Sequence, residues 1–177
     1  MTTPSPDLSK TLNPARAILL GTLVVGGLDI SDALIFYGFR GVAPIRIFHS
    51  IAAGLLGGPA ARAGGLATAL LGALLHFFIA FCIVATFYLA SRRMELLTRQ
   101  PVWTGVAYGI VVYFVMNLVV LPLSAVTPGA FPPPTAILLN GVLIHAFGVG
   151  LPSALFARRV PREAAAPTLR LTMGQAP

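Results

Sequence analysis

The chain alternates long apolar segments with short polar ones. Four segments stay dominated by apolar residues for about 20 positions or more, at residues 17–37, 66–90, 104–126 and 136–157. A helix of that length crosses a hydrocarbon core of about 30 Å, because each residue adds about 1.5 Å. The pattern predicts an all-α membrane protein in which residues 14–160 form a four-transmembrane-helix bundle.

The loop between the first two apolar segments predicts one additional short helix. This helix can begin at Pro44, because proline is favoured at the first helical position, and end before Gly57 and Gly58. Arg46 and Ser50 are four positions apart and share one of its faces. At about 13 residues the helix is too short to span, so we expect it to be interfacial or re-entrant.

Basic residues cluster at the ends of the apolar segments, and their distribution predicts an orientation. Cytoplasmic loops of membrane proteins carry an excess of lysine and arginine. With a cytoplasmic N-terminus, nine of the 12 basic residues lie on the cytoplasmic side: Lys10, Arg16, Arg92, Arg93, Arg99, Arg158, Arg159, Arg162 and Arg170. The other three lie outside: Arg40, Arg46 and Arg62. We therefore expect both termini to be cytoplasmic, with residues 1–13 and 161–177 as disordered tails.

Composition makes lipid the solvent of most of the chain. Hydrophobic residues make up 56% of the sequence and charged residues 10%, against about 25% charged in soluble domains. The net charge of +7 comes from span ends, without the basic stripe interleaved with aromatics that is typical of nucleic-acid binding. The expected partner is the lipid bilayer, and no nucleic acid. Cys82, the only cysteine, lies in an apolar run, where we expect a small buried side chain and no disulfide.

The types of basic and small residues bear on which membrane holds the protein. Lys10 is the only lysine among the 12 basic residues, and alanine is abundant. This bias is common in proteins from GC-rich bacterial genomes. We therefore expect a multi-pass protein of the bacterial inner membrane.

Each apolar segment carries a strongly polar residue at a similar distance from its expected cytoplasmic end. Four such residues lie roughly 19–24 Å above that end: Asp29, His76, Asn117 and His145. Asp32 lies one turn beyond Asp29 on the same face. A charge at the helix centre costs at least about 2.5–3.5 kcal/mol in lipid, so we expect these residues to face the bundle interior as a polar layer. We also expect at least one direct hydrogen bond between helices among the four.

The acids of the polar layer raise the question of their cationic partners. Arg40 and Arg46 are the nearest cations along the chain, and both are possible ion-pair partners. If the first loop folds back over the bundle, Arg46 comes close to Asp32.

Two interpretations of the polar layer remain open. In the first, its side chains join the helices, since each hydrogen bond between helices contributes about 0.6–2 kcal/mol in a membrane. In the second, it is a proton path, an ion site or a cofactor site. A b-type haem between His76 and His145 is one form of the second, because bundles build cofactor sites from facing side chains. No metal-ligand spacing appears elsewhere, and we expect no metal ion and no cofactor beyond this haem alternative.

Small residues and prolines predict how the third and fourth spans pack. Each span has two small residues four positions apart, which allow close approach of helices within the chain: Gly105 and Gly109, and Ala146 and Gly150. Pro122 and Pro152 each remove a backbone hydrogen bond and should distort their helices.

Several short motifs resemble the YagU-like family of small bacterial inner-membrane proteins, whose biochemical activity is not established. The motifs are His76, Arg92-Arg93, Tyr108-Gly109, Asn117, Leu121-Pro122-Leu123, Thr127-Pro128, His145 and Arg158-Arg159. The resemblance covers about residues 70–160. It implies location and topology, but it supplies no catalytic residues.

Three classes of function fit these features. The first is a non-enzymatic membrane protein, alone, as a homo-oligomer or within a larger membrane complex. The second is a small oligomeric transporter or proton-conducting unit that uses Asp29, Asp32, His76 and His145. The third is a haem or quinone protein. The sequence has no nucleophile–base pair and no phosphate-binding glycine loop, so we do not expect an enzyme and predict no catalytic residue.

Overall fold

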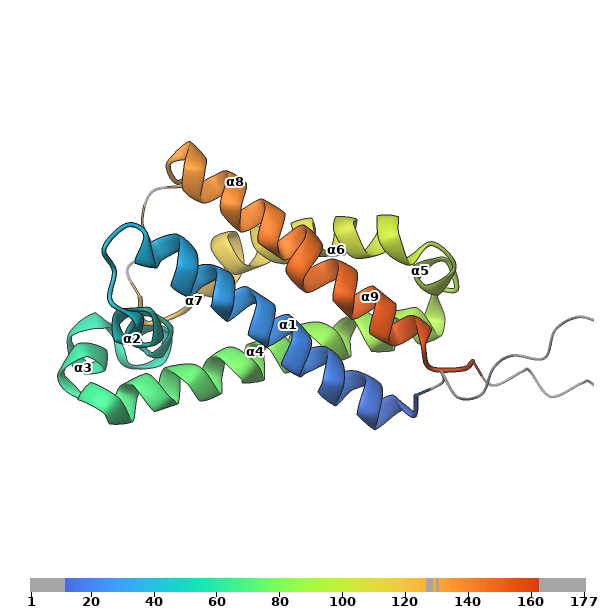
Figure 1. The fold of residues 1–177 in the computed structure, drawn as a ribbon, viewed down its shortest axis with the longest axis horizontal. Coiled ribbons are helices and arrows are strands. Elements are labelled where there is room, and N and C mark those ends of the chain that lie inside the picture. Colours follow the sequence, from blue (N-terminus) through green and yellow to red (C-terminus); the bar gives the residue numbers. More distant parts are fainter. Residues whose placement is uncertain (1–11, 127–128, 130, 163–177) are drawn as a thin grey trace, which may run out of the picture.

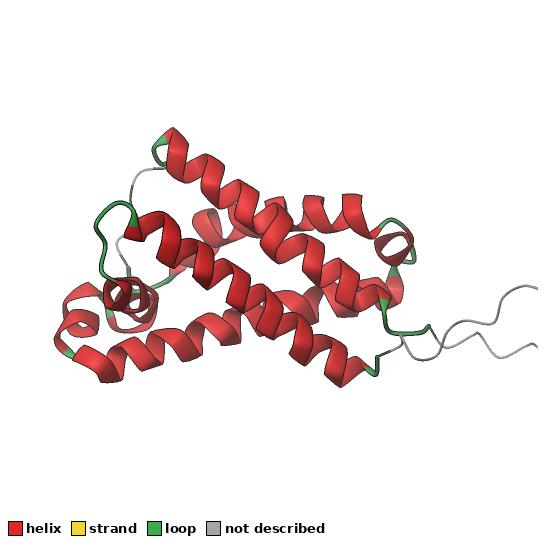
Figure 2. Ribbon diagram, in the orientation of Figure 1, coloured by secondary structure: helices red, strands yellow, loops and turns green. Residues whose placement is uncertain are grey.

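The computed structural model describes residues 12–126, 129 and 131–162. Within these residues the chain is helical and contains no strand (Figure 2). Four helices are long and apolar enough to cross a membrane: Pro14–Gly38, Gly65–Arg93, Pro101–Leu123 and Thr135–Arg158. The predicted fold class is confirmed, including the short apolar helix of the first loop, Pro44–Leu56. Most of the two predicted tails lies outside the described residues.

Two of the spans are continuous α-helices and two contain a π-helical segment. The continuous spans are α1 (Pro14–Gly38) and α4 (Gly65–Arg93). The third span consists of α6 (Pro101–Val115), the π-helical η2 (Met116–Val120) and α7 (Leu121–Leu123). The fourth consists of α8 (Thr135–Leu143), the π-helical η3 (Ile144–Gly150) and α9 (Leu151–Arg158). The short helices of the loops are α2 (Pro44–Leu56), α3 (Gly58–Ala63) and α5 (Leu96–Arg99).

The two distorted spans carry the prolines that were expected to distort them. Pro122 and Pro152 each lie at the second residue of the α-helix that follows a π-helical segment. Because proline has no N–H, the carbonyl one turn earlier loses its usual partner, and the helix widens there. Asn117 and His145 therefore lie in π-helical turns, which are wider than those of a regular α-helix.

The third span ends earlier than expected, at Leu123 instead of Val126. Ser124 is extended, and the next backbone N–H, from Ala125, donates to the Gly54 carbonyl of α2 at 2.8 Å. A continued helix would have kept that N–H for its own turn. The contact fixes the end of α7 against the first-loop helix.

Figure 1 shows how the spans are arranged. The first and fourth spans lie in front of the second and third, and α2 is seen end-on, crosswise to the spans at one end. At the opposite end, the backbone N–H of Leu12 donates to the Arg159 carbonyl at 2.9 Å. Both ends of the main described segment therefore lie on the same side of the bundle. α1 packs on α4, η3 and α9, and α6 packs on η3 and α9. The backbones of α4 and α6 stay farther apart, and Tyr108 joins the two helices by donating to the Ile83 carbonyl at 2.7 Å.

Small residues bring the third and fourth spans into backbone contact, as expected. A Cβ added at Gly105 would lie 2.9 Å from the carbonyl oxygen of Gly150. A Cβ at Gly109 would collide with the carbonyl group of His145 and with Ala146. Only glycine allows this approach, which places the start of η3 and its histidine beside α6.

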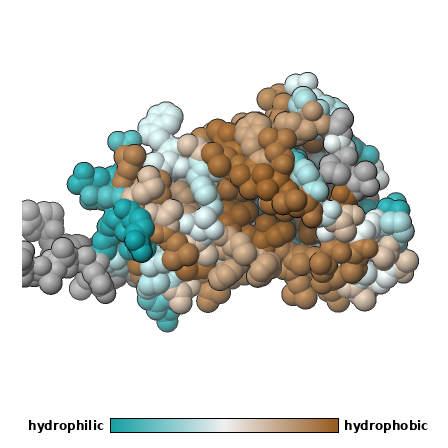
Figure 3. Space-filling view, turned by 180° about the vertical axis from the view of Figure 1, so that it is seen from behind, coloured by the Kyte–Doolittle hydropathy of each residue, from teal (hydrophilic) through white to brown (hydrophobic). Residues whose placement is uncertain are grey.

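The outer surface of the bundle suits lipid. Large apolar side chains point outward, among them Leu74 at 71% and Ile35 at 61% exposure. Seen from behind in Figure 3, a broad hydrophobic band separates two ends that carry hydrophilic residues. Cys82 is exposed on this surface, so the expectation of a buried cysteine was wrong. In lipid a small apolar side chain has no need of burial by protein.

Candidate functional site

One cavity of about 630 Å³ gathers polar side chains from all four spans. Asp29 of α1, His76 of α4, Asn117 of η2 and His145 of η3 all line it. Most of its wall is apolar, including Ile30, Ile79, Ala80, Ile83, Met116, Val120 and Val149. The cavity therefore combines an apolar body with a few polar groups, which is the usual construction of a small-molecule site.

The His76 side chain joins the second span to the first. Its Nε2 lies 2.9 Å from the carbonyl oxygen of Gly26. Because a carbonyl oxygen only accepts, Nε2 carries the hydrogen, and Nδ1 of the neutral ring remains an acceptor. Gly26 permits the contact, since a Cβ there would lie 2.7 Å from the ring of Phe77.

His145 and Asn117 are held by their own helices. His145 donates from Nδ1 to the Gly141 carbonyl at 2.9 Å, which leaves Nε2 as the acceptor of the neutral ring. Asn117 donates from Nδ2 to the Tyr113 carbonyl at 2.8 Å. The ring of Tyr113 also stacks edge-on against His145, with centroids 5.4 Å apart. The orientation of both cavity side chains is thus fixed by the third and fourth spans.

Asp29 has a different environment from the other three. It is half-buried and accepts no hydrogen bond from any residue that the structure describes. Both histidines and Asp32 lie within its electrostatic range. The expected direct hydrogen bond among Asp29, His76, Asn117 and His145 is absent. Where these side chains bond, they bond to backbone carbonyls, whose second lone pair remains available in a helix.

Asp32 is not part of the cavity lining. It points to the fourth span, where its Oδ2 accepts a hydrogen bond of 2.7 Å from Nδ2 of Asn140. This is a direct bond between side chains of α1 and α8. Sequence reasoning missed Asn140, although an amide within an apolar span was a signal available to it.

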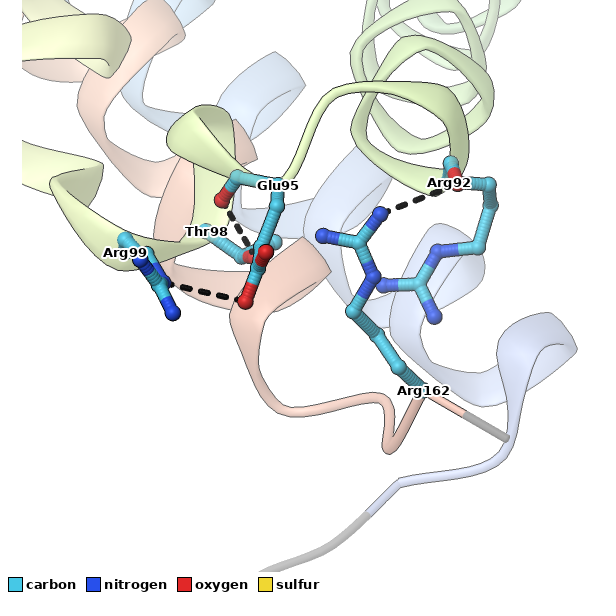
Figure 4. Close-up of polar contacts among 5 residues, drawn as sticks. All are labelled: Arg92, Glu95, Thr98, Arg99 and Arg162. Atoms are coloured by element: carbon cyan, nitrogen blue, oxygen red, sulfur yellow. Dashed lines mark hydrogen bonds and ion pairs between the residues drawn. The ribbon is translucent and has the colours of Figure 1, made fainter. Parts of the chain in front are cut away.

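The predicted ion pairs of the first loop are not formed. Arg40 donates to the carbonyl of Phe36 at 2.9 Å, and its guanidinium lies 3.6 Å from the centre of the Phe36 ring. Arg46 lines the cavity but is exposed, and no carboxylate among the described residues pairs with it. In the described part of the chain the ion pair that does form joins Arg99 to Glu95 at 2.9 Å, at the other end of the bundle (Figure 4). The first-loop helix does not place Arg46 against an acid.

The first-loop helix α2 forms the roof of the cavity. Its polar face, with Arg46 and Ser50, lines the cavity beside Ile47 and Ile51. Its other side packs on α4, where His49 is buried and donates from Nε2 to the Gly65 carbonyl at 2.8 Å. α2 lies crosswise to the spans at this end of the bundle (Figure 1).

The end of the bundle opposite to the roof carries an arginine cluster. Arg92 donates to the carbonyl of Pro161 at 3.1 Å, and Arg162 donates to the carbonyl of Arg92 at 3.0 Å (Figure 4). Cations are stabilising at helix C-termini, where carbonyls lack partners. Arg92, at the end of the second span, and Arg162, just beyond the fourth, therefore tie the ends of these two spans together.

The site fits a bis-histidine haem poorly. His76 donates from Nε2 to Gly26, so ligation through that nitrogen would break the bond that joins α4 to α1. Within the described residues no group of three or more His, Cys, Asp or Glu side chains is placed to hold a metal ion.

Any functional interpretation of the cavity rests on its own geometry. No family model, curated protein or solved structure matches the chain.

Proposed function

We propose that this chain is a non-enzymatic, multi-pass protein of the bacterial inner membrane that binds a small lipid-soluble molecule within its bundle. One observation carries the proposal: a cavity of about 630 Å³ with apolar walls and one polar group from each of the four spans. Small-molecule sites typically have volumes of about 300–1,000 Å³ and a similar mixture of groups.

The arrangement of the helices supports access from the bilayer. The cavity is lined by His76 and Ile79 of α4 on one side and by Asn117 and Val120 of η2 on the other. Beside the cavity the backbones of α4 and η2 stay apart, although both line it. Farther from α2, the two spans meet where the Tyr108 hydroxyl donates to the Ile83 carbonyl at 2.7 Å. This side of the bundle faces the viewer in Figure 3, where a hollow interrupts the hydrophobic band. A ligand dissolved in lipid can enter between these spans.

The same proposal includes cytoplasmic termini and membership of the YagU-like family. Orientation is supported by the basic residues at the end of the bundle where Leu12 bonds to Arg159. Family membership is supported by His76, Asn117 and His145, which carry the resemblance and share one cavity.

The ligand-binding function is tested by filling the cavity. Ala33 lines it, and Ala33→Phe places an aromatic ring in the space. Ile35 is two residues further along α1 and 61% exposed, so Ile35→Phe adds the same ring toward lipid. Native mass spectrometry of protein extracted from cells in mild detergent should show a small molecule on the wild type and on Ile35→Phe, but not on Ala33→Phe. A wild type without a bound molecule, or equal occupancy in both variants, contradicts the proposal.

A small oligomeric transporter or proton-conducting unit is the second candidate. It is favoured by Asn117 and His145 lying on π-helical segments just before prolines, because such interruptions are typical of moving spans. Flux measured in proteoliposomes distinguishes it from a binding protein. Asp29→Asn keeps a polar side chain but removes the titrating proton, so it should abolish proton-coupled flux and leave passive ligand binding measurable.

A further inference from the structure

We propose that the ligand of the cavity is a lipid-soluble amine, whose protonated head binds Asp29, His76, His145 and Asn117. The inference rests on the proposed ligand-binding function and names its substrate class. The tail of the amine lies along the apolar wall and leaves toward lipid between α4 and η2.

The hydrogen bonds of the polar side chains leave mainly acceptors for a ligand. A neutral imidazole has one N–H. His76 donates that hydrogen to the Gly26 carbonyl, and His145 donates its N–H to the Gly141 carbonyl. Asn117 uses one amide hydrogen on Tyr113. The groups left are therefore two imidazole nitrogens, an amide oxygen with one amide hydrogen, and the carboxylate of Asp29.

An ammonium group complements this set. It has three donors and no acceptor, so it can bond to the carboxylate and to both imidazoles without displacing any backbone bond. It also supplies the positive charge that Asp29 lacks, because in the described residues no arginine forms an ion pair with it. A charge in hydrocarbon requires such a partner.

Other head groups fit less well. A carboxylate or phosphate would meet Asp29 and acceptor nitrogens, with repulsion as the result. A quinone presents only carbonyl oxygens, for which the groups around Asp29 supply a single donor, the second amide hydrogen of Asn117. An alcohol can donate only once. The acceptors around Asp29 thus discriminate between head groups by the number of donors and by charge.

The remaining charged and titratable groups of the cavity are Arg46 of α2 and Tyr37 of α1. Arg46 lies in the roof, and its exposed side chain can turn toward water, where its charge is screened. The head then lies at the level of Asp29 and the two histidines, between the roof and the apolar residues at the far end of the cavity, which are Val25, Ile83, Met116 and Val149. The tail then lies along Ile79, Ile83, Met116 and Val120.

The test uses the full-length protein in nanodiscs and three probes that share one straight twelve-carbon tail: dodecylammonium, 1-dodecanol and dodecanoate. Binding is measured by native mass spectrometry and by thermal shift. We expect dodecylammonium to bind at least about tenfold more tightly than dodecanol, because a hydrogen bond to a charged partner contributes more binding free energy than a neutral one. Dodecanoate should bind most weakly. This comparison uses the wild type and does not depend on the folding of a variant.

A variant pair then locates the head. Asp29→Asn should weaken dodecylammonium by about tenfold and weaken dodecanol less, because the alcohol carries no charge. Asp32→Asn is the matched control, because Asp32 lies one turn away, bonds to Asn140 and does not line the cavity. It should leave all three probes unchanged.

The outcomes separate the two proposals. Equal or tighter binding of dodecanol or dodecanoate overturns the amine and leaves the ligand-binding function standing. Equal effects of the two aspartate substitutions on dodecylammonium also overturn the amine. Failure of all three probes to bind, together with an empty wild type extracted from cells, overturns both.

Discussion

The close contact between the third and fourth spans gives the sharpest prediction about stability. The perturbation is Gly105→Ala, which adds one methyl group where α6 meets η3 and α9. That methyl would lie 2.9 Å from the Gly150 oxygen, the Leu151 Cα and the Ala154 Cβ. Carbon atoms in contact are ordinarily about 3.5–4.0 Å apart, so the helices must separate by about 0.6–1.1 Å. Two of the three neighbours are backbone atoms, which cannot rotate away.

The expected magnitude follows from two opposing effects. Overfilling a packed contact costs about 1–3 kcal/mol. Alanine in a helix is favoured over glycine by about 0.5–1 kcal/mol, which offsets part of that cost. Gly27→Ala on α1 isolates the second effect, because a Cβ there would have no neighbour within 4 Å. The free energy of unfolding of Gly105→Ala should therefore lie about 1–3 kcal/mol below that of Gly27→Ala.

The assay is equilibrium unfolding by titration with sodium dodecyl sulfate in mixed micelles. Circular dichroism reports the helices, and fluorescence of Trp103, the only tryptophan, reports the neighbourhood of the contact. Because both variants replace glycine by alanine inside a span, their difference measures packing alone. Equal stability of the two variants would refute the reasoning, since it would mean that α6 and η3 do not approach through their glycines.

Two further predictions concern the first span and the topology. In a double-mutant cycle of Asp32→Ala and Asn140→Ala, the coupling free energy should be about 0.6–1.7 kcal/mol; a value near zero would show that their bond does not hold α1 to α8. Alkaline phosphatase fused after Phe131 should be active and a fusion after Arg162 inactive, because the two positions are expected on opposite sides of the membrane. Activity at both positions contradicts the topology.

Hydropathy predicted the spans because each lipid-crossing helix must satisfy its own backbone hydrogen bonds. The length and apolar character of a segment are therefore enough to identify it as a span. The residue at which the third span ends, by contrast, is decided by a contact with a residue that is distant in the sequence. Ala125 gives its N–H to Gly54 of α2, a residue about 70 positions earlier, and no pattern around Leu123 indicates that partner. The small-residue pairs, by contrast, predicted helix packing correctly because close approach depends on side-chain size alone.

The hydrogen-bond partners of the polar residues could not be predicted from the depth of those residues along their spans alone. Depth along a helix can be counted at about 1.5 Å per residue, but the direction of a side chain around the bundle depends on which helices are neighbours. Asp32 and Asn140 lie about 24 and 27 Å from their basic residues Arg16 and Arg158, so depth counting could have paired them. It could not have shown that His76 bonds to the backbone of Gly26, because every helical carbonyl is an equivalent candidate in the sequence.

The distribution of these bonds bears on the two interpretations of the polar layer. Side chains that only join helices would be expected to bond to one another, which consumes their donors and acceptors and fills the space between them. Here His145 and Asn117 bond within their own helices, and Asp29 accepts no bond from the described residues. In the described residues the hydrogen bond between side chains of two spans, from Asn140 to Asp32, lies outside the cavity, and His76 joins α4 to α1 through the Gly26 carbonyl. A joining role therefore belongs to Asp32, Asn140 and one nitrogen of His76, while the unused acceptors around Asp29 favour a ligand.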